Sequence, residues 1–144
     1  MKSETSKVNK NLNTFIIIAA VIIILIAIYF YRSGKKNAEG PQVEYPHGTE
    51  SIPAGWSPTA LVDELKSVMS GLFTFSGTKD DTWKKLRDLP NDDMVIAVYN
   101  VFGQKYFGEG KGTLTKWIND EYNYDFLSGV KEGTLARLRY LNLP

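Results

Sequence analysis

The stretch DDMVIAVYNVFGQK, residues 92–105, decides the fold of this chain. Its apolar side chains recur at steps of three and four residues, which places on one side of a helix Met94, Val95, Val98, Tyr99 and Phe102. Pro90 breaks the chain ahead of this stretch, and the carboxylates of Asp92 and Asp93 can offset the exposed N–H groups of a first helical turn. The pattern predicts a central helix over residues 92–105 and assigns the two acids to capping.

Two further helices are expected on its N-terminal side. Ser57 supplies a capping hydroxyl and Pro58 suits the first helical position, so a helix begins there and ends at Gly71. Its apolar stripe consists of Leu61, Leu65, Val68 and Met69. A shorter helix begins at Thr78, with the Asp80-Asp81 pair capping its predicted first turn, and its apolar residues are Trp83 and Leu86.

Two more helices are expected on the C-terminal side. Thr113 follows a glycine-rich run and can cap a helix that carries Leu114, Trp117, Ile118 and, towards its end, Tyr122. Leucines at steps of three then indicate a short helix over residues 132–141. No stretch alternates polar and apolar residues between hairpin turns. We therefore expect residues 56–144 to form an all-α domain of five short helices, with most of its aromatic side chains in the core.

A long apolar run precedes this domain. Residues 15–31 read FIIIAAVIIILIAIYFY, without charge, Pro or Gly, and the upstream neighbours extend the run to residues 12–31. At about 1.5 Å per residue, its length matches the roughly 30 Å hydrocarbon core of a bilayer. A core helix that is apolar all round would need a larger protein around it, and no small-residue cleavage pair of a signal peptide follows Tyr31. We expect a transmembrane helix over residues 12–31, after a polar tail of residues 1–11.

The flanks of this run leave its orientation balanced, because basic residues stand on both sides of it. Its position near the N-terminus is typical of a signal anchor, which favours a domain on the translocated side of a bacterial inner membrane or a virion membrane. Residues 32–55 are rich in Gly, Pro and small polar residues and predict a flexible linker. The only histidine, His47, lies there without a neighbouring ligand, and we interpret it as solvated.

Composition argues against several classes of function. Seventeen basic and sixteen acidic residues leave a net charge of +1, so no long-range field attracts nucleic acid. The absence of cysteine rules out disulfides, thiolate metal sites and cysteine nucleophiles. Residues 108–113 are rich in glycine but lack the spacing of a phosphate-binding loop. A hydrolase would have to rest on Glu64, Glu109 or Glu121 alone, so we expect a protein that is not an enzyme and requires no cofactor.

The order of the predicted helices resembles a single repeat of the annexin family over about residues 59–141. The similarity is carried by LKSVMSGL at residues 65–72, GTKDD at 77–81, VIAVYNVFG at 95–103, and the start and end of the fourth helix at 113–122. The resemblance implies five helices with a Gly-Thr loop between the first two. It also implies binding to lipid phosphates through calcium.

In annexin repeats, main-chain carbonyls after the first helix and a carboxylate at the end of the fourth bind the ion. Carried over, the carbonyls belong to Met69, Gly71 and Gly77, and the carboxylate belongs to Glu121. Oxygen ligands of this kind suit calcium. The chain departs from the family in two places: the Gly-Thr loop is stretched to residues 71–78, and a glycine-rich insertion precedes the fourth helix. Annexins also usually join four repeats, whereas one stands here.

Phe73 and Phe75 flank Thr74 in the stretched loop, where they are either an exposed contact for a membrane or partner, or simply buried. The sequence thus supports two expectations of function. The first is a non-enzymatic, single-pass membrane protein that acts as a structural, assembly or interaction subunit, with the bilayer and other proteins as partners, in a membrane-containing virion or a bacterial envelope complex. The alternative is a calcium-dependent phospholipid-binding module.

Overall fold

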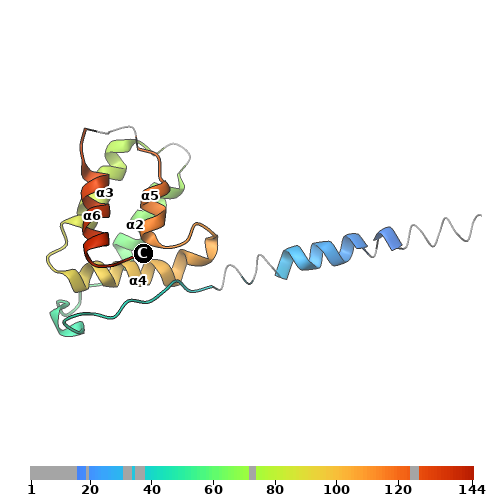
Figure 1. Cartoon of the computed structure of the whole chain (residues 1–144), viewed down its shortest axis with the longest axis horizontal. Coiled ribbons are helices and arrows are strands. Elements are labelled where there is room, and N and C mark those ends of the chain that lie inside the picture. The colour runs from blue at the N-terminus through green and yellow to red at the C-terminus, as the bar shows by residue number, and fades with distance from the viewer. Residues whose placement is uncertain (1–15, 19, 31–33, 35–37, 72–73, 124–126) are drawn as a thin grey trace, which may run out of the picture. The chain divides into compact units, whose positions relative to one another are not determined.

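The computed structural model describes the chain at residues 16–18, 20–30, 34, 38–71, 74–123 and 127–144. The chain divides into two compact units, Met1–Asn37 and Ala38–Pro144. In the first unit, residues 16–18 and 20–30 are helical (Figure 1). These residues are exposed. The predicted tail of residues 1–11, and residues 12–15, 19 and 31 of the predicted transmembrane helix, lie outside the described residues. Within the described part, no helix is both long enough and apolar enough to cross a membrane.

The second unit is helical, and its described residues contain no strand. Its α-helices are α2 (Thr59–Ser70), α3 (Ser76–Arg87), α4 (Asp92–Tyr106), α5 (Leu114–Asp120) and α6 (Val130–Tyr140). A short 3-10 turn, η1 (Thr49–Ser51), precedes them, and a second one, η2 (Phe107–Glu109), lies between α4 and α5. Figure 1 shows α4 along one side of this unit, with the other α-helices stacked above it. The prediction of an all-α domain is confirmed for the described residues.

Helix α4 carries more buried residues than any other described helix, although it lies along one side of the unit and not at its centre (Figure 1). The Asn91 side chain accepts a hydrogen bond from the Met94 N–H at 2.9 Å and caps the helix, so that Asp92 and Asp93 fall in the first turn. The Phe102 ring packs edge to face against Trp117 of α5, with ring centroids 5.5 Å apart. The largest fully buried side chains around it include Leu65, Trp83, Leu86, Tyr99, Phe102, Leu114, Ile118 and Leu138.

Two predictions about helix ends are wrong. Helix α3 begins at Ser76 rather than Thr78, and its first turn contains no acidic residue, so the Asp80-Asp81 pair does not cap it. Asp80 is instead buried, and its carboxylate accepts a hydrogen bond from the Asn123 side chain at 2.8 Å. Helix α5 ends at Asp120, which leaves Tyr122 outside the helix and 60 % exposed instead of in the core.

The structure also differs from the predicted flexible linker over residues 32–55. From Ala38 onward the chain belongs to the helical unit, and residues 38–52, here named the strap, run along α4 (Figure 1). Val43 and Tyr45 of the strap are half-buried against the core. The composition of the strap did not indicate this packing, because the strap contacts α4 largely through its own main-chain atoms, which bond to polar side chains at and near α4.

Substitution of Leu65 by Ala tests the core. Leu65→Ala should lower the free energy of unfolding by about 2–5 kcal/mol, because it empties a fully buried position. Lys84→Ala, on an exposed part of α3, should change it by less than about 0.5 kcal/mol. Urea unfolding of the full chain in detergent can be followed by the fluorescence of its three tryptophans, all of which lie in the helical unit. Equal effects of the two substitutions would contradict this core.

Candidate interaction surface

Three helix ends meet at the end of the domain farthest from α4: the N-terminus of α3, the C-terminus of α5 and the N-terminus of α6 (Figure 1). We call this region the loop end and define it as residues 74–80, 119–123 and 127–131. It contains Gly77 and Glu121, which the annexin resemblance selects, and Phe75, which the sequence indicates as a contact residue. Phe73 lies outside the described residues.

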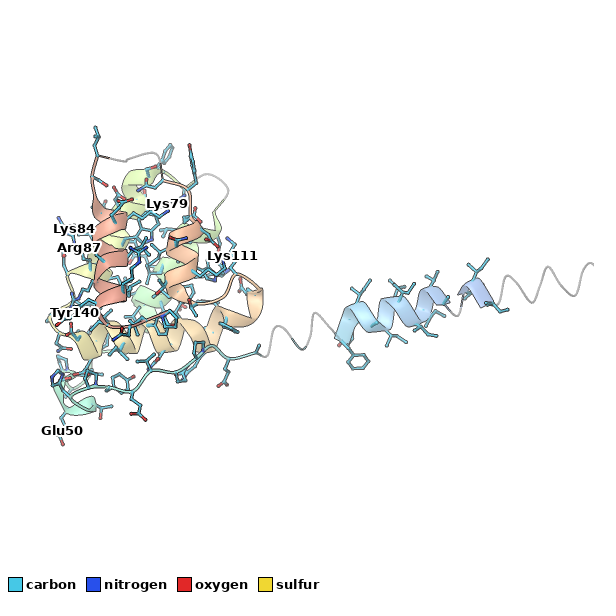
Figure 2. The ribbon with its side chains drawn as sticks, in the orientation of Figure 1. Glu50, Lys79, Lys84, Arg87, Lys111 and Tyr140 are labelled. Carbon is cyan, nitrogen blue, oxygen red and sulfur yellow. The ribbon has the colours of Figure 1, made fainter. Side chains whose placement is uncertain are left out.

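An ion pair between two helices organises the loop end. The Lys79 ammonium, from the second turn of α3, donates to Glu121 Oε1 at 2.5 Å and to the main-chain carbonyl of Tyr122 at 2.8 Å. The two charged side chains are only 8 % and 15 % exposed. Figure 2 shows Lys79 at this end of the domain. Because both charges are largely removed from water, the pair is costly to break and fixes the chain after α5 against α3.

Further hydrogen bonds hold the same segment. Asn123 donates to the buried carboxylate of Asp80, one residue after Lys79. From the other side, the Lys131 ammonium of α6 donates to the main-chain carbonyls of Asn119 at 2.9 Å and Glu121 at 2.7 Å. The carbonyls that α5 leaves without helical partners are therefore satisfied by a cation, as helix C-termini favour. The result is an irregular segment with a defined path from α5 as far as Asn123.

Three large side chains of the loop end are exposed, and one of them, Tyr122, lies on this supported segment. Phe75 is 83 % exposed where it caps α3, and Leu127 is 98 % exposed just before α6. Tyr122 is 60 % exposed, although its carbonyl is held by Lys79. Single exposed apolar residues are ordinary, whereas three on the connections at one end of the domain make that end the candidate contact surface.

The residues of the predicted calcium site are only partly brought together. Met69 is buried in the last turn of α2, Gly71 ends that helix with an extended backbone, and Gly77 lies in the first turn of α3. Glu121 is at the loop end, but its carboxylate is paired with Lys79. A calcium ion there would have to replace an ammonium group at 2.5 Å. Among the described residues no cluster of three or more histidine or acidic side chains could hold a metal, and the calcium site stays a prediction.

The other candidate acids are also engaged by lysines. Glu64 accepts hydrogen bonds from Lys85 at 2.6 Å and Thr82 at 3.0 Å, and the bond from Lys85 lowers the pKa of its carboxyl group. Glu109 pairs with Lys66 at 2.7 Å. The residues 108–113 that resemble a phosphate loop begin in the turn η2 after α4 and end at Thr113, which caps α5 through the Lys116 N–H.

Sequence reasoning missed Lys79, Asp80, Asn123 and Lys131 as the residues that organise this region. The ion pair joins positions 42 residues apart, so no local pattern could reveal it. Comparison of the chain with family models, with curated proteins and with solved structures found no match.

A double-mutant cycle tests the Lys79–Glu121 pair. Lys79→Met should lower the free energy of unfolding by about 3 kcal/mol, because it leaves a largely buried carboxylate unpaired. Adding Glu121→Met should restore part of that loss, because the uncompensated charge is then removed. The exposed pair of Lys116 and Asp120 is the matched control, and Lys116→Met should have little effect. Urea unfolding gives all the values, and strictly additive losses at Lys79 and Glu121 would contradict the pairing.

Proposed function

We propose that this chain is a non-enzymatic, single-pass membrane protein whose helical domain is an interaction or assembly subunit, and that the loop end contacts a protein partner. The observation that carries the proposal is the exposure of Phe75, Tyr122 and Leu127 at one end of the domain, where the Lys79–Glu121 pair ties the segment that carries Tyr122 to α3. A preorganised apolar surface binds without first having to be ordered, which lowers the entropic cost of association.

The charges at the loop end favour a protein partner over a lipid surface. Binding to anionic lipid relies on lysine or arginine side chains that are free to approach the headgroups. Here the ammonium of Lys79 is engaged by Glu121, and that of Lys131 is engaged by main-chain carbonyls. Exposed apolar side chains within a polar surround that is not basic match the anatomy of protein–protein contacts.

The engagement of the carboxylates supports a function without catalysis. A general acid that works near neutral pH needs a raised pKa. The pKa of Glu64 is instead lowered, chiefly by the hydrogen bond from Lys85. Glu109 and Glu121 are each paired with a lysine, so a substrate would have to displace that lysine.

Membrane attachment, in this proposal, rests on the charge-free run of residues 12–31. A permanent anchor removes the need for a calcium-dependent one, so an annexin-like repeat on such an anchor is available to bind other proteins. The proposed setting is a larger assembly in a bacterial envelope or a membrane-containing virion, with the domain on the translocated side.

Loss of binding after substitution at the loop end is the test of this function. The double variant Phe75→Ser/Leu127→Ser should lose a protein that co-purifies with the full chain under gentle detergent extraction, with at least a tenfold fall in recovery. Tyr140→Ser is the matched control, because Tyr140 is 78 % exposed at the far end of α6. A partner retained equally by both variants, or a chain that purifies alone, would refute the proposal.

Calcium titration separates this function from phospholipid binding. The Glu121 carboxylate is paired with the Lys79 ammonium and is not free to bind calcium. Calorimetric titration of the full chain in detergent should therefore detect no calcium binding in the micromolar range. The variant Lys79→Met frees the carboxylate and is the positive comparison. Binding to the unaltered chain that disappears in Glu121→Gln would instead support the calcium-dependent module.

A further inference from the structure

The strap is held by side chains of α4 that bond to its main chain. Asn100, which is 5 % exposed, uses both halves of its amide on Val43: Nδ2 donates to the Val43 carbonyl at 2.8 Å, and Oδ1 accepts from the Val43 N–H at 2.9 Å. This pairing reproduces the two hydrogen bonds that a neighbouring β-strand would make to the same residue. Asn100 therefore recognises the main chain of Val43 and not its side chain.

The start of the strap makes a second contact of the same kind. The Gly40 N–H donates to the Gly103 carbonyl of α4 at 3.1 Å. A Cβ at Gly40 would lie 2.9 Å from Gly103 Cα, so the two backbones approach closely because both positions are glycine. Beside them, Gln104 of α4 donates to the Gln42 side chain at 3.1 Å.

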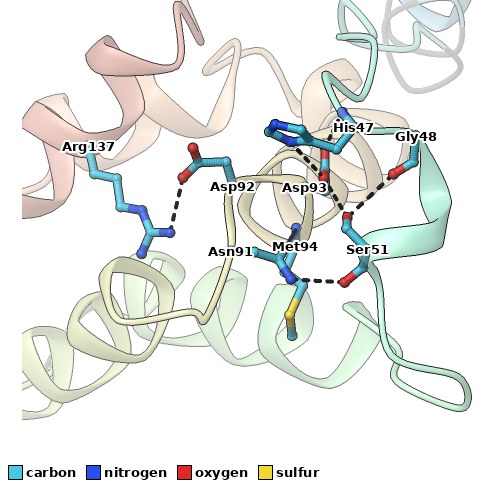
Figure 3. A network of polar contacts seen from close by, with 8 residues as sticks. All are labelled: His47, Gly48, Ser51, Asn91, Asp92, Asp93, Met94 and Arg137. Atoms are coloured by element: carbon cyan, nitrogen blue, oxygen red, sulfur yellow. Dashed lines mark hydrogen bonds and ion pairs between the residues drawn. The ribbon is translucent and has the colours of Figure 1, made fainter.

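The other end of the strap is tied to the first turn of α4 (Figure 3). The Asp93 carboxylate is buried and accepts hydrogen bonds from the His47 N–H at 3.4 Å and from the Ser51 hydroxyl. The Asn91 side chain, which also caps α4, donates to the Ser51 carbonyl at 2.9 Å. Asp92 points the other way, towards Arg137 of α6.

These contacts follow one stripe of α4, from Gly103 through Asn100 to Asp93, while the strap runs from Gly40 through Val43 to His47. The strap is therefore antiparallel to α4, and the stripe is a groove for an extended peptide. Most of the bonds go to main-chain atoms, so a strap from another copy of the chain would satisfy the groove equally well.

The connection between the strap and α2 can permit such an exchange. Pro53, Ala54 and Gly55 are exposed, and Gly55 has a positive φ of 82° with open space around it. A turn closed by the Trp56 N–H on the Pro53 carbonyl leads from there to α2. A change of backbone direction within this short hinge would leave the contacts of α4 intact.

We propose that two copies of this chain exchange straps, so that the strap of each copy occupies the α4 groove of the other. The exchange keeps every strap contact and changes only the hinge, which is why swapped dimers form at low cost. The inference rests on the proposed membrane anchor in one respect, because anchored copies share a surface and reach a high effective concentration. Its partner is a second copy of this chain, whereas the loop end serves a different protein.

Cysteine cross-linking between two differently tagged chains tests the exchange. Gln42→Cys on one chain and Gln104→Cys on the other introduce thiols into a protein that has none, at exposed side chains that meet at 3.1 Å in the groove. After co-expression, a short bis-maleimide reagent on intact membranes should join the two tags. The matched control pairs Gln42→Cys with Lys84→Cys, an exposed residue of α3, and should give at most a tenth of that yield.

Asn100→Ala distinguishes specific exchange from proximity. It removes both bonds to Val43, so the yield of the Gln42/Gln104 pair should fall severalfold while that of the control pair stays unchanged. Inter-chain yields equal to the control, with cross-linking only inside a chain that carries both cysteines, would overturn the proposal. This outcome is independent of the partner test at the loop end, because neither cysteine position belongs to that surface.

Discussion

Helix α4 has to bury an apolar face and a polar stripe at the same time, and the rest of the helical domain is arranged around that constraint. Val95, Val98 and Phe102 face the other helices and form the core. Asp93 and Asn100, on the same helix, are almost as well removed from water. Buried polar groups of this kind are costly unless their hydrogen bonds are made, and the strap makes them. The strap is thus required by α4, and is not merely a connection to it.

The loop end also contains largely buried polar groups, here the charged pair of Lys79 and Glu121. Lys79 and Glu121 lose most of their contacts with water. Their contact with each other, and the bond from Lys79 to the carbonyl of Tyr122, replace those lost contacts. Their contact supports an irregular segment that would otherwise have few apolar contacts of its own. Tyr122, which is 60 % exposed, therefore lies on a segment that polar interactions hold in place. The strap packs along α4, and the loop end lies at the end of the domain farthest from α4 (Figure 1).

The helices were predictable because their signals are local. The cap at Thr113 and the spacing of apolar residues in α4 each act within one or two helical turns, and the structure confirms them. Asp92 and Asp93 fall in the first turn of α4 as expected, but the side chain of Asn91 makes the cap. The role of Asp80 was not predictable, because its carboxylate is held by Asn123, which lies 43 residues further along the chain. The same limit applies to Lys79 and Glu121.

One residue of α4 indicates in the sequence that a further segment packs against this helix. Asn100 is a polar residue in the middle of the most apolar helix of the domain, and a buried amide at such a position requires a partner. Its partner is a main chain, which has no signature in the sequence, and the Gly- and Pro-rich composition of residues 38–52 is equally typical of a free linker.

Amide hydrogen exchange at Val43 tests the central claim, that the strap is part of the domain, most directly. In the full chain in detergent, the Val43 N–H should exchange at least a hundredfold more slowly than in an unstructured peptide, because it donates to the buried Asn100 amide. Asn100→Ala should remove most of that protection while the amides of α4 remain slow. Exchange of Val43 at the unstructured rate in the unaltered chain would contradict the account.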